Sequence, residues 1–552
     1  MIDGAVKRQV RSNGVQLAVV EAGNAARPTL IFVHGYPDTK EVWRDVFAQL
    51  AHRYHVVAYD VRGAGESSSP RGLAAYDFER LADDLEAVIE QVAGGRAVHL
   101  VGHDWGAVQG WEFAALERIA RKLASFTAVA GPSLEQVVAG GRALLRRPTP
   151  PHLAQLVRRM RRSWYVAALW IPGAPTLATD GRKGANLYRR NIPRRLLRPR
   201  LERTSSVPVQ VVIPTRDHFI SPDYYEPAER FAAVIKRRLM GTTHWVPLTE
   251  PALLASWIKD FVDEVEAGRA ASSSAPWVRG GGLEQLPGRL AVVTGAGSGI
   301  GRATAAALAA RGVRVLLVDR DSGALAQAAP DIRAAGTFIC DVSDERAMER
   351  LCDQVLARHG VPDIVVNNAG IGVAGSFLET SFREWRRVLG VNLMGVVHGC
   401  RLFGRAMVQR GGGGHIVNIA SAAAFQPAKD LAAYSASKAA VLMASECLRA
   451  ELAPHGIGVT AACPGFVHTN ITRTTRYVGR GEADARRMAE RVTQLYERRN
   501  YAPERVAEEI LTAIARDRPV AVVTPEARVM HALSRFAPGL RRRLAMLDTL
   551  PA

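Results

Sequence analysis

Three residues in the first half of this 552-residue chain have the types and the order needed for nucleophilic hydrolysis. Asp104 stands at the centre of the run Gly102–Gly106, which follows the short apolar segment Ala97–Val101, and Asp217 and His244 come later. A carboxylate can displace an alkoxide or a halide at a saturated carbon and so form an ester with the protein. A histidine that is oriented by a second acid can then activate water to cleave that ester. The order of the three residues therefore predicts hydrolysis in two steps.

The second half contains a tyrosine and a lysine whose spacing suits proton transfer. Tyr434 and Lys438 are four residues apart, so on a helix both side chains lie on the same face. A lysine cation near a phenol lowers the pKa of that phenol, and the tyrosine can then act as general acid or base. The pair predicts the oxidoreduction of a secondary alcohol or a ketone.

A glycine-rich loop before this pair has the form that binds a dinucleotide. It follows the predicted strand Leu290–Val293 and opens an alanine-rich helix, and its glycines permit a tight turn and close approach to a pyrophosphate. Asp319 ends the next predicted strand, where a carboxylate bonds the adenosine ribose and repels a 2′-phosphate. Arg320 follows and is able to bind such a phosphate, so NAD is favoured and NADP stays open. The loop residues predicted to contact the cofactor are Thr294, Gly295, Ser298, Gly299, Ile300 and Gly301.

Both groups of residues need an α/β scaffold, and the chain is long enough for two. Such domains commonly have ~100–250 residues, and residues 267–286, rich in Ala, Ser and Gly, predict a flexible linker. On both sides of it short β-branched runs alternate with amphipathic helical stretches, the pattern of parallel-sheet α/β domains. We therefore expect one domain over residues 1–266 and another over residues 287–552. The composition, 48% hydrophobic and 23% charged, excludes a disordered or fibrous chain.

Residues 5–265 resemble the epoxide hydrolase branch of the α/β-hydrolase fold. The run His34–Pro37 matches the HGxP motif of that family, the run around Asp104 matches its nucleophile elbow, and an insertion at about 132–205 matches its helical cap. The resemblance implies that the backbone amides of Tyr36 and Trp105 hold an oxyanion during ester cleavage.

The family also supplies two cap tyrosines that protonate the leaving oxygen, and here the sequence departs from the family pattern. Tyr188 stands where the second is expected. The first is expected just before Ile171–Gly173, where the sequence reads Ala-Ala-Leu-Trp, and Tyr165 is the nearby substitute. Two alternatives stay open. One is a dehalogenase, with Trp105 holding the halide, although Tyr36 occupies the position where dehalogenases commonly have Asn; the other is a catalytically silent module that binds substrate or a membrane.

Residues 287–530 resemble the short-chain dehydrogenase/reductase family, whose principal motifs occur here in order. The resemblance implies a Rossmann fold in which Tyr434 is the catalytic acid or base and Lys438 also binds the nicotinamide ribose. It implies that Ser421 polarises the substrate oxygen and that Asn392 supports a proton relay through Lys438. A homo-oligomer is implied as well, with helices near 381–405 and 431–452 at the interface.

The same resemblance implies further contacts to the cofactor. Asp341 is implied to contact the adenine, Asn368 the adenosine side and Thr469 the carboxamide. The implied cofactor-binding residues beyond the glycine-rich loop are Asp319, Arg320, Asp341, Val342, Asn368, Ala369, Gly370, Tyr434, Lys438, Pro464, Gly465 and Thr469.

The chain has a formal net charge of +19, and most of it lies in one segment. Residues 132–205 contain 16 Lys and Arg but three acidic residues, a net charge of +13. We find no nucleic-acid-binding module, so we expect no nucleic acid partner. The basic cap, with Arg541–Arg543, is expected to attract an anionic membrane surface or a carboxylate-bearing substrate. A solvated arginine-rich surface is the alternative.

The remaining features favour a cytoplasmic protein that acts on small molecules. The five cysteines lack the CxxC spacing of a zinc site, no metal is expected, and the chain start lacks the apolar core of a signal peptide. The domain order is similar to that of epoxide hydrolase–dehydrogenase fusions of actinobacteria, which implies a lipid-like substrate. Because a diol formed from an epoxide is also a secondary alcohol, the two domains are expected to catalyse consecutive steps.

Overall fold

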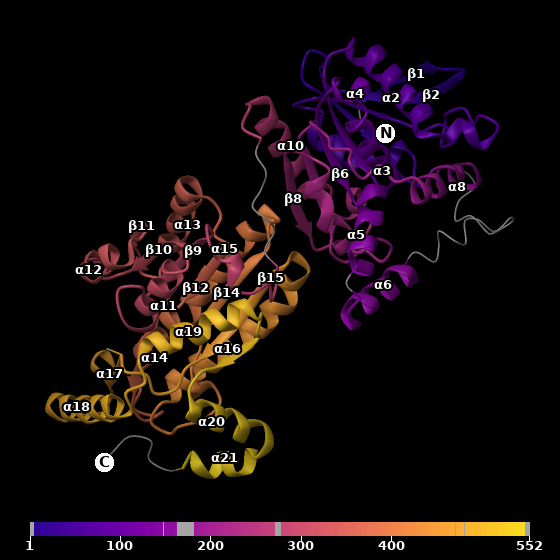
Figure 1. Ribbon diagram of the computed structural model, residues 1–552. Helices are drawn as coiled ribbons and strands as arrows, with labels where there is room; N and C mark the ends of the chain where they lie inside the picture. Colours follow the sequence, from indigo (N-terminus) through magenta and orange to yellow (C-terminus); the bar gives the residue numbers. More distant parts are fainter. Residues whose placement is uncertain are drawn as a thin grey trace. The chain divides into compact units, whose positions relative to one another are not determined.

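A computed structural model describes residues 5–146, 148–162, 181–270, 278–469, 471–479 and 481–546 of the chain. The chain folds into two compact units, Met1–Pro276 and Trp277–Ala552, each built on its own sheet. They run from indigo to magenta and from magenta to yellow in Figure 1. Among the described helices, none has the length and apolarity that crossing a bilayer requires.

The first unit contains an eight-stranded sheet in the order β1-β2-β4-β3-β5-β6-β7-β8. Strand β2 runs antiparallel to both of its neighbours, and the strands from β4 to β8 are parallel. The central strands β3, β4 and β5 are buried along their whole length, as β-branched runs are when helices cover both faces of a sheet. The strands are β1 (Val6–Ser12), β2 (Val15–Ala22), β3 (Thr29–Val33), β4 (His55–Tyr59), β5 (Val98–His103), β6 (Leu123–Val129), β7 (Val209–Pro214) and β8 (Ile235–Met240).

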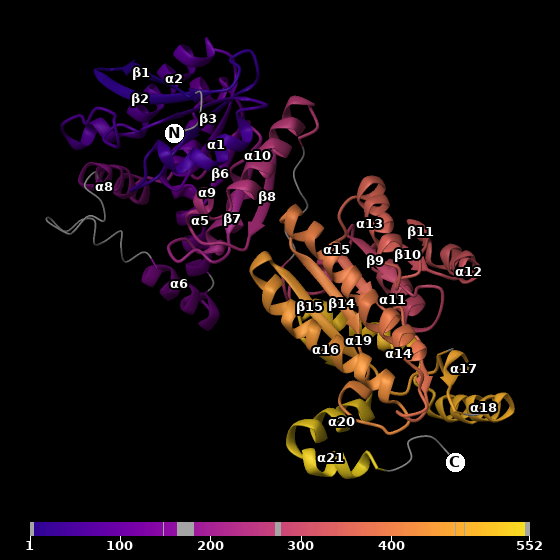
Figure 2. The same ribbon diagram turned by 180° about the vertical axis from the view of Figure 1, so that it is seen from behind.

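Helices cover both faces of this sheet. Helices α2 and α3 pack on one face in one apolar cluster, and α1 and α10 pack on the other face in a second cluster (Figures 1 and 2). An insertion between β6 and β7 contains α5, α6 and α8, which we call the cap. The helices are α1 (Arg44–Leu50), α2 (Phe78–Ala93), α3 (Trp105–Ala114), α4 (Glu117–Ala120), α5 (Leu134–Arg146), α6 (Pro150–Arg162), α8 (Gly181–Leu197), α9 (Val246–Thr249) and α10 (Pro251–Glu266), with 3₁₀ turns η1 (Lys40–Trp43), η2 (Leu73–Tyr76) and η3 (Pro222–Arg230).

The second unit contains a seven-stranded parallel sheet in the order β11-β10-β9-β12-β14-β15-β17. The chain starts at the centre, at β9, moves to one edge and then crosses over to β12, so β9 and β12 flank the point where the direction of winding reverses. Ligands bind at such a point in open α/β sheets. The strands are β9 (Leu290–Thr294), β10 (Arg314–Asp319), β11 (Gly336–Ile339), β12 (Ile364–Asn367), β14 (Gly414–Ile419), β15 (Ile457–Cys463) and β17 (Val520–Val522), and a separate pair is formed by β13 (Val373–Ala374) and β16 (Arg476–Tyr477).

Two apolar clusters fill the faces of this sheet. One lies under α11, α12 and α19, and the other lies under α13, α15 and α16. The helices are α11 (Gly299–Ala309), α12 (Ser322–Ile332), α13 (Glu345–His359), α14 (Phe382–Leu389), α15 (Gly395–Arg410), α16 (Ala432–Leu452), α17 (Ile471–Thr474), α18 (Glu482–Arg499), α19 (Pro503–Ala515), α20 (Pro525–Phe536) and α21 (Pro538–Leu544), with short turns η4 (Leu283–Gln285), η5 (Gly390–Met394), η6 (Ala422–Ala424) and η7 (Ala453–His455).

The segment expected to be a flexible linker over 267–286 is ordered at its C-terminal end. Arg279 forms an ion pair with Asp517, with 2.7 Å between Nε and Oδ2, and the amide of Gly282 donates a hydrogen bond to the carbonyl oxygen of Ala515. The side chain of Leu286 is fully buried. These contacts bind residues 278–286 to the second unit, and the Gly- and Ser-rich composition did not reveal them.

Candidate active sites

Asp104 lies in a sharp turn between β5 and α3 of the first unit. Its backbone has φ +50° and ψ −118°, a conformation that non-glycine residues rarely adopt and that is typically found at functional turns. The turn requires glycine on both sides because a Cβ on Gly102 would overlap the carbonyl of Gly106, and one on Gly106 would overlap that of Val33. The local sequence thus forces the side chain of Asp104 into one position.

The structure brings the three predicted hydrolytic residues together. His244 follows β8, and its Nδ1 lies 2.7 Å from Oδ2 of Asp217, while its Nε2 lies 3.4 Å from Oδ2 of Asp104. The other oxygen of Asp217 accepts hydrogen bonds from the amides of Phe219 and Ile220 at 2.7 and 3.0 Å. All three side chains of the group are buried. The arrangement is that of a carboxylate next to a histidine that a second acid orients.

The charges of the group reinforce one another. Burial alone lowers the pKa of His244, but its hydrogen bonds to Asp104 and Asp217 outweigh burial and raise the pKa to about 10. Burial raises the pKa of Asp104, yet the hydrogen bond from His244 and the one from the amide of Tyr36 bring it below its ordinary value. At neutral pH Asp104 is therefore an ionised carboxylate beside an imidazolium.

One of the two expected oxyanion amides contacts the carboxylate. The amide of Tyr36 donates a hydrogen bond to Oδ1 of Asp104 at 2.9 Å. For Trp105 the described contacts are made by its ring, which packs against Phe78 and Tyr188.

Of the two predicted cap tyrosines, the structure describes one. Tyr188, on α8, is buried with its ring 5.5 Å from that of Tyr36 and 4.7 Å from that of Trp105. It thus lies against both residues whose amides were expected to hold the oxyanion. Tyr165 lies outside the described residues.

A third acid, Asp38, lies at this site and was not singled out from the sequence. Oδ2 of Asp38 accepts a hydrogen bond from the indole of Trp245 at 3.2 Å and lies 3.8 Å from Nδ1 of His103. Burial, together with the charge of Asp104, raises the pKa of Asp38 to about 6. His103 in turn contacts the carbonyl of His244. Asp38 directly follows the His34–Pro37 run, and that position was the available signal.

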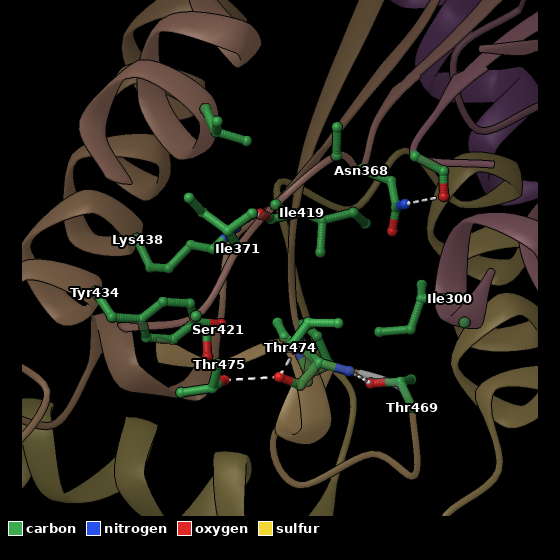
Figure 3. Close-up of a pocket in the computed structure, with 18 of the residues that line it drawn as sticks. Ile300, Asn368, Ile371, Ile419, Ser421, Tyr434, Lys438, Thr469, Thr474 and Thr475 are labelled. Atoms are coloured by element: carbon green, nitrogen blue, oxygen red, sulfur yellow. Dashed lines mark hydrogen bonds between the residues drawn. The ribbon is translucent and has the colours of Figure 1, made fainter. Parts of the chain in front are cut away.

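The second site is a cavity of about 490 Å³, a volume typical of small-molecule sites. Its lining contains the glycine-rich loop at one end and Ser421, Tyr434 and Lys438 at the other. In Figure 3 Tyr434 and Lys438 extend from one helix toward Ser421 and Ile419, and Ile300 and Asn368 lie across the pocket. Two predicted sets of residues that are far apart in the sequence therefore share one cavity.

The glycine-rich loop has the shape of a cradle for a dinucleotide. Gly295 and Gly299 have φ of +63° and +54°, and a Cβ on Gly295 would lie 2.8 Å from the Cα of Ala369. A Cβ on Gly301 would overlap the carbonyl of Gly295. Helix α11 begins at Gly299, so its first amides face the cavity as an anion site. The residues present therefore fit a pyrophosphate.

The acids and amides expected at the adenosine end lie in the same cavity lining. Oδ2 of Asp319 accepts a hydrogen bond from the amide of Gly297 at 2.9 Å, which connects the end of β10 to the loop. Asp341, Val342, Ala369, Gly370, Pro464, Gly465 and Thr469 also line the cavity, together with Ser298, Arg320 and Asn368. Thr294 does not line it; instead its hydroxyl oxygen accepts hydrogen bonds from the amides of Asn368 and Ala369 at 3.0 and 3.2 Å. Thr294 therefore holds in place the backbone of Asn368 and Ala369, which line the cavity, without lining it itself.

The catalytic end of the cavity brings Tyr434, Lys438 and Ser421 together. Burial raises the pKa of Tyr434, and a hydrogen bond with Ser421 opposes that rise. Nζ of Lys438 lies 5.9 Å from the centroid of the Tyr434 ring and donates a hydrogen bond to the carbonyl of Ile419 at 2.8 Å. Burial lowers the pKa of Lys438 to about 8. The lowering of the phenol pKa that was expected from Lys438 is not found: burial is the largest cause of the shift, and the hydrogen bond that opposes it comes from Ser421.

Asn392 is fully buried in a π-helical turn, η5, between α14 and α15. Its Oδ1 accepts from the amide of Ile371 at 2.8 Å, and its Nδ2 donates to the carbonyl of Ile371 at 3.0 Å. Nδ2 also donates to the hydroxyl of Ser437, next to Lys438. No direct contact between Asn392 and Lys438 is recorded within the described ranges. Neither Ile371 nor Ser437 was singled out from the sequence, because single aliphatic and hydroxyl residues carry no motif.

Part of the cavity lining is apolar. Tyr477 and Val492 belong to a small separate core that connects β16 and α18, and Met530 comes from α20. Residues near the C-terminus of the described chain pack on the same unit: the guanidinium of Arg541 donates a hydrogen bond to the carbonyl oxygen of Phe425 at 3.1 Å. Over the described part of the chain, no group of His, Cys, Asp and Glu has the geometry of a metal site.

Comparisons with known proteins identify both domains. Residues 28–251 match the model of the alpha/beta hydrolase fold, and residues 289–477 match that of the short chain dehydrogenases. The protein of Mycobacterium tuberculosis named "Probable oxidoreductase EphD" is 37% identical over 580 residues, which cover 98% of each chain. The chain belongs to the EphD family of oxidoreductases. The chain joins an α/β-hydrolase domain, which matches the first model, to a short-chain dehydrogenase domain, which matches the second. This result confirms the predicted fold class.

Other relatives share the second domain alone. The galactitol 2-dehydrogenase (L-tagatose-forming) of Cereibacter sphaeroides is 41% identical over 196 residues, which cover 35% of this chain and 76% of that protein. A crystal structure of a short chain dehydrogenase/reductase from Burkholderia phymatum in complex with NAD is 33% identical, covers 48% of this chain and 98% of that chain, and has a TM-score of 0.42. The C-terminal domain is an oxidoreductase domain, and the protein is an enzyme that acts on a small molecule.

Proposed function

We propose that the C-terminal domain oxidises a secondary alcohol, or reduces the ketone, with NAD as cofactor. The observation that carries this proposal is the single cavity that holds Tyr434, Ser421 and Lys438 together with the glycine-rich cradle. The carboxylate of Asp319 at the adenosine end favours NAD over NADP, because it repels a 2′-phosphate.

Different residues of the cavity bind the cofactor, bind the substrate and transfer the proton. The cradle holds the pyrophosphate, and Lys438 holds the nicotinamide ribose. When bound, NAD accepts the hydride that leaves the alcohol carbon. Ser421 donates a hydrogen bond to the substrate oxygen, and the phenolate form of Tyr434 accepts the hydroxyl proton as the carbonyl forms. Lys438, whose pKa is about 8, is able to exchange that proton onward near neutral pH.

The test compares wild-type protein with Tyr434→Phe. We expect NADH formation from secondary alcohols in the wild type and a loss of ~10²–10⁴-fold in the variant, the size of a lost general acid or base. Tyr434→Phe should still quench NADH fluorescence on binding, since the cradle is intact. A variant that retained the wild-type rate would contradict the proposal.

We propose that the N-terminal domain hydrolyses epoxides through an ester on Asp104. The geometry of Asp104, His244 and Asp217 carries this proposal. A carboxylate oxygen of Asp104 attacks an epoxide carbon, the carbon–oxygen bond of the ring breaks, and the alkoxide takes a proton from a cap tyrosine, for which Tyr188 is the described candidate. The amide of Tyr36, already bonded to Asp104, stabilises the oxyanion formed when water attacks the ester.

The charge balance explains how His244 changes from acid to base. In the resting site two carboxylates hold it as an imidazolium. Formation of the ester removes the charge of Asp104, so the pKa of His244 falls, and its proton passes to the phenolate left when the cap tyrosine protonated the alkoxide. Neutral His244 then takes a proton from water, the hydroxide attacks the carbonyl carbon of the ester, and the diol leaves with restoration of the carboxylate.

Intact-protein mass spectrometry tests this proposal. His244→Gln protein, mixed with an alkyl epoxide, should gain the full mass of one epoxide and keep it. Asp104→Asn, the matched control, should gain nothing. An alkyl adduct from a haloalkane, but not from the epoxide, would indicate the dehalogenase alternative. The lack of any adduct would favour a silent binding module.

We further propose that the two domains act in sequence on a lipid-like substrate, from epoxide to diol to hydroxy-ketone. The apolar residues Tyr477, Val492 and Met530 in the lining of the dehydrogenase cavity support a substrate with an apolar chain. Wild-type protein should form NADH from a fatty epoxide, Asp104→Ala should form none, and the diol should restore it. If neither epoxide nor diol yields NADH, this sequence of reactions is refuted. We also propose a homo-oligomer that forms through α15 and α16.

A further inference from the structure

Helix α6 of the cap has an outward face that is apolar and basic. Leu153, Val157 and Met160 are exposed to 48%, 55% and 70%, although each is a large hydrophobic side chain. They follow one another at four and three residues, so they form a single stripe along the helix. Isolated exposed apolar residues are ordinary on protein surfaces, but a stripe of three on one short helix marks an interaction surface.

Arg161 borders this stripe, Arg158 and Arg162 lie farther round the helix, and these arginines are not neutralised by the described residues. Arg158 and Arg161 are exposed and Arg162 is half-buried, and none of the three forms an ion pair with the described residues. The 13 residues of α6 include no acidic residue. An amphipathic helix that is polar overall and carries arginine at the border of its apolar stripe has the composition of helices that lie in the interface of an anionic bilayer.

The inner face of α6 shows that this orientation is determined by packing. Arg159 is buried and forms an ion pair with Asp223, with 2.9 Å between Nε and Oδ2, and its guanidinium lies 4.6 Å from the ring centroid of Tyr224. The side chain of Gln155 also donates a hydrogen bond to Asp223. These contacts bind one face of α6 to η3 of the hydrolase core, so the face with Val157 and Arg161 has to point outward.

The neighbouring helix extends the same surface. On α5, Leu145 is 59% exposed, and Arg142 and Arg146 are exposed beside it. Helices α5 and α6 lie next to each other in both views of the first unit (Figures 1 and 2). Apolar side chains able to enter an acyl layer thus alternate with arginines able to reach lipid phosphates.

We propose that the outer faces of α5 and α6 dock the protein on the surface of an anionic phospholipid bilayer. Leu145, Leu153, Val157 and Met160 enter the interface, and Arg142, Arg146, Arg158, Arg161 and Arg162 bind the lipid phosphates. The helices lie parallel to the membrane plane and do not cross it. This inference does not depend on the chemistry of either active site, and it applies equally if the hydrolase domain is silent.

Co-sedimentation of the full-length chain with sucrose-loaded vesicles tests the proposal. Vesicles of 70% phosphatidylcholine and 30% phosphatidylglycerol should bind the wild type, and pure phosphatidylcholine vesicles should bind it at least tenfold more weakly. The triple variant Arg158→Gln, Arg161→Gln, Arg162→Gln should lose about 100-fold in affinity, because each cation near an anionic surface contributes about fivefold. Val157→Ser with Met160→Ser should also weaken binding while leaving the charge unchanged.

A matched control separates α6 from net charge. Arg11, Arg71 and Arg230 are exposed arginines of the same unit, and their replacement by Gln lowers the charge equally. That control triple should bind like the wild type apart from a small salt-dependent loss. The thermal unfolding midpoint of each variant, followed by the fluorescence of the tryptophans of the first unit, shows that the unit carrying the changes is folded.

Three results would overturn the proposal. The first is a wild type that stays in the supernatant with anionic vesicles, and the second is equal binding by the α6 and control triples. The third is binding of a single-stranded oligonucleotide that is lost in the α6 triple while vesicle binding is not. Loss of vesicle binding in both α6 variants, with retention in the control triple, supports it.

Discussion

Replacement of His244 by Gln tests the charge arrangement of the hydrolase site through stability, independently of any substrate. Asp104 and Asp217 raise the pKa of His244 from 6.5 to about 10. At 1.36 kcal/mol per pKa unit this rise corresponds to about 5 kcal/mol of interaction in favour of the folded state. Even half of it is a large part of the stability of a domain.

The sign follows from the direction of the shift. A raised pKa in the folded state stabilises fully below the unfolded value of 6.5, and the stabilisation disappears as the pH rises through about 10. His244→Gln loses the charged partner and leaves two buried carboxylates. We therefore expect the free energy of unfolding of His244→Gln to be lower than that of the wild type near neutral pH. The difference should shrink by about 3 kcal/mol between pH 6.5 and about pH 9.5.

Urea unfolding followed by tryptophan fluorescence measures this difference, because seven of the nine tryptophans lie before residue 276 and report mainly on the first unit. His103→Gln is the matched control. His103 is buried beside His244, but burial, together with the charge of His244, lowers its pKa to about 4, so it is neutral throughout the range. Its replacement should destabilise by an amount that does not change with pH. A difference for His244→Gln that is equally independent of pH would refute the imidazolium between two carboxylates.

Three further predictions concern the dehydrogenase domain. Lys438→Met should lower kcat for alcohol oxidation by ~10²–10⁴-fold and abolish the pH dependence near pH 8, measured by NADH absorbance from pH 6 to 10; an unchanged profile would contradict the role of its lowered pKa. Gly301→Ala should raise the Kd for NADH more than tenfold in a fluorescence titration, since its methyl group would overlap the carbonyl of Gly295; normal binding would show that the loop yields. Asp319→Ser should shift the ratio of kcat/KM for NADP over NAD upward at least tenfold, and a constant ratio would mean that another residue selects the cofactor.

The sequence predicted those parts of the two sites whose positions are determined locally. In the elbow around Asp104 and in the loop from Gly295 to Gly301, the backbone comes so close to other backbone atoms that only glycine fits. The glycines can therefore be recognised as motifs in the sequence. The fold class is also determined locally: short β-branched runs that alternate with amphipathic helical stretches predicted the α/β fold. The contact between Asp104 and His244 is not determined locally, because the two residues are 140 positions apart in the chain. Only the order of the motifs suggested that they meet.

The parts that the sequence did not reveal depend on neighbours from elsewhere in the chain. Asp38 is one acid among many until Trp245 and His103 surround it. The side chain of Asn392 was expected to act through Lys438, whereas its hydrogen bonds hold Ile371 and Ser437. The ordered end of the expected linker has the same origin, since Arg279 finds its partner, Asp517, more than two hundred residues later.

The net charge of the cap shows why a count of residues cannot identify a binding surface. Part of this charge fastens the cap to the acidic residues of the hydrolase core. These pairs are Arg159 with Asp223, Arg190 and Arg194 with Asp77, and Arg195 with Glu112, while Arg195 also pairs with Glu135 inside the cap. Charges bound in this way are partly screened from solvent and contribute little to a field outside the molecule. The arginines of α6 that face outward have no such partner among the described residues, and they alternate with exposed apolar side chains. The surface that can recognise an anionic membrane is therefore defined by which arginines the fold leaves unpaired, and not by how many it contains.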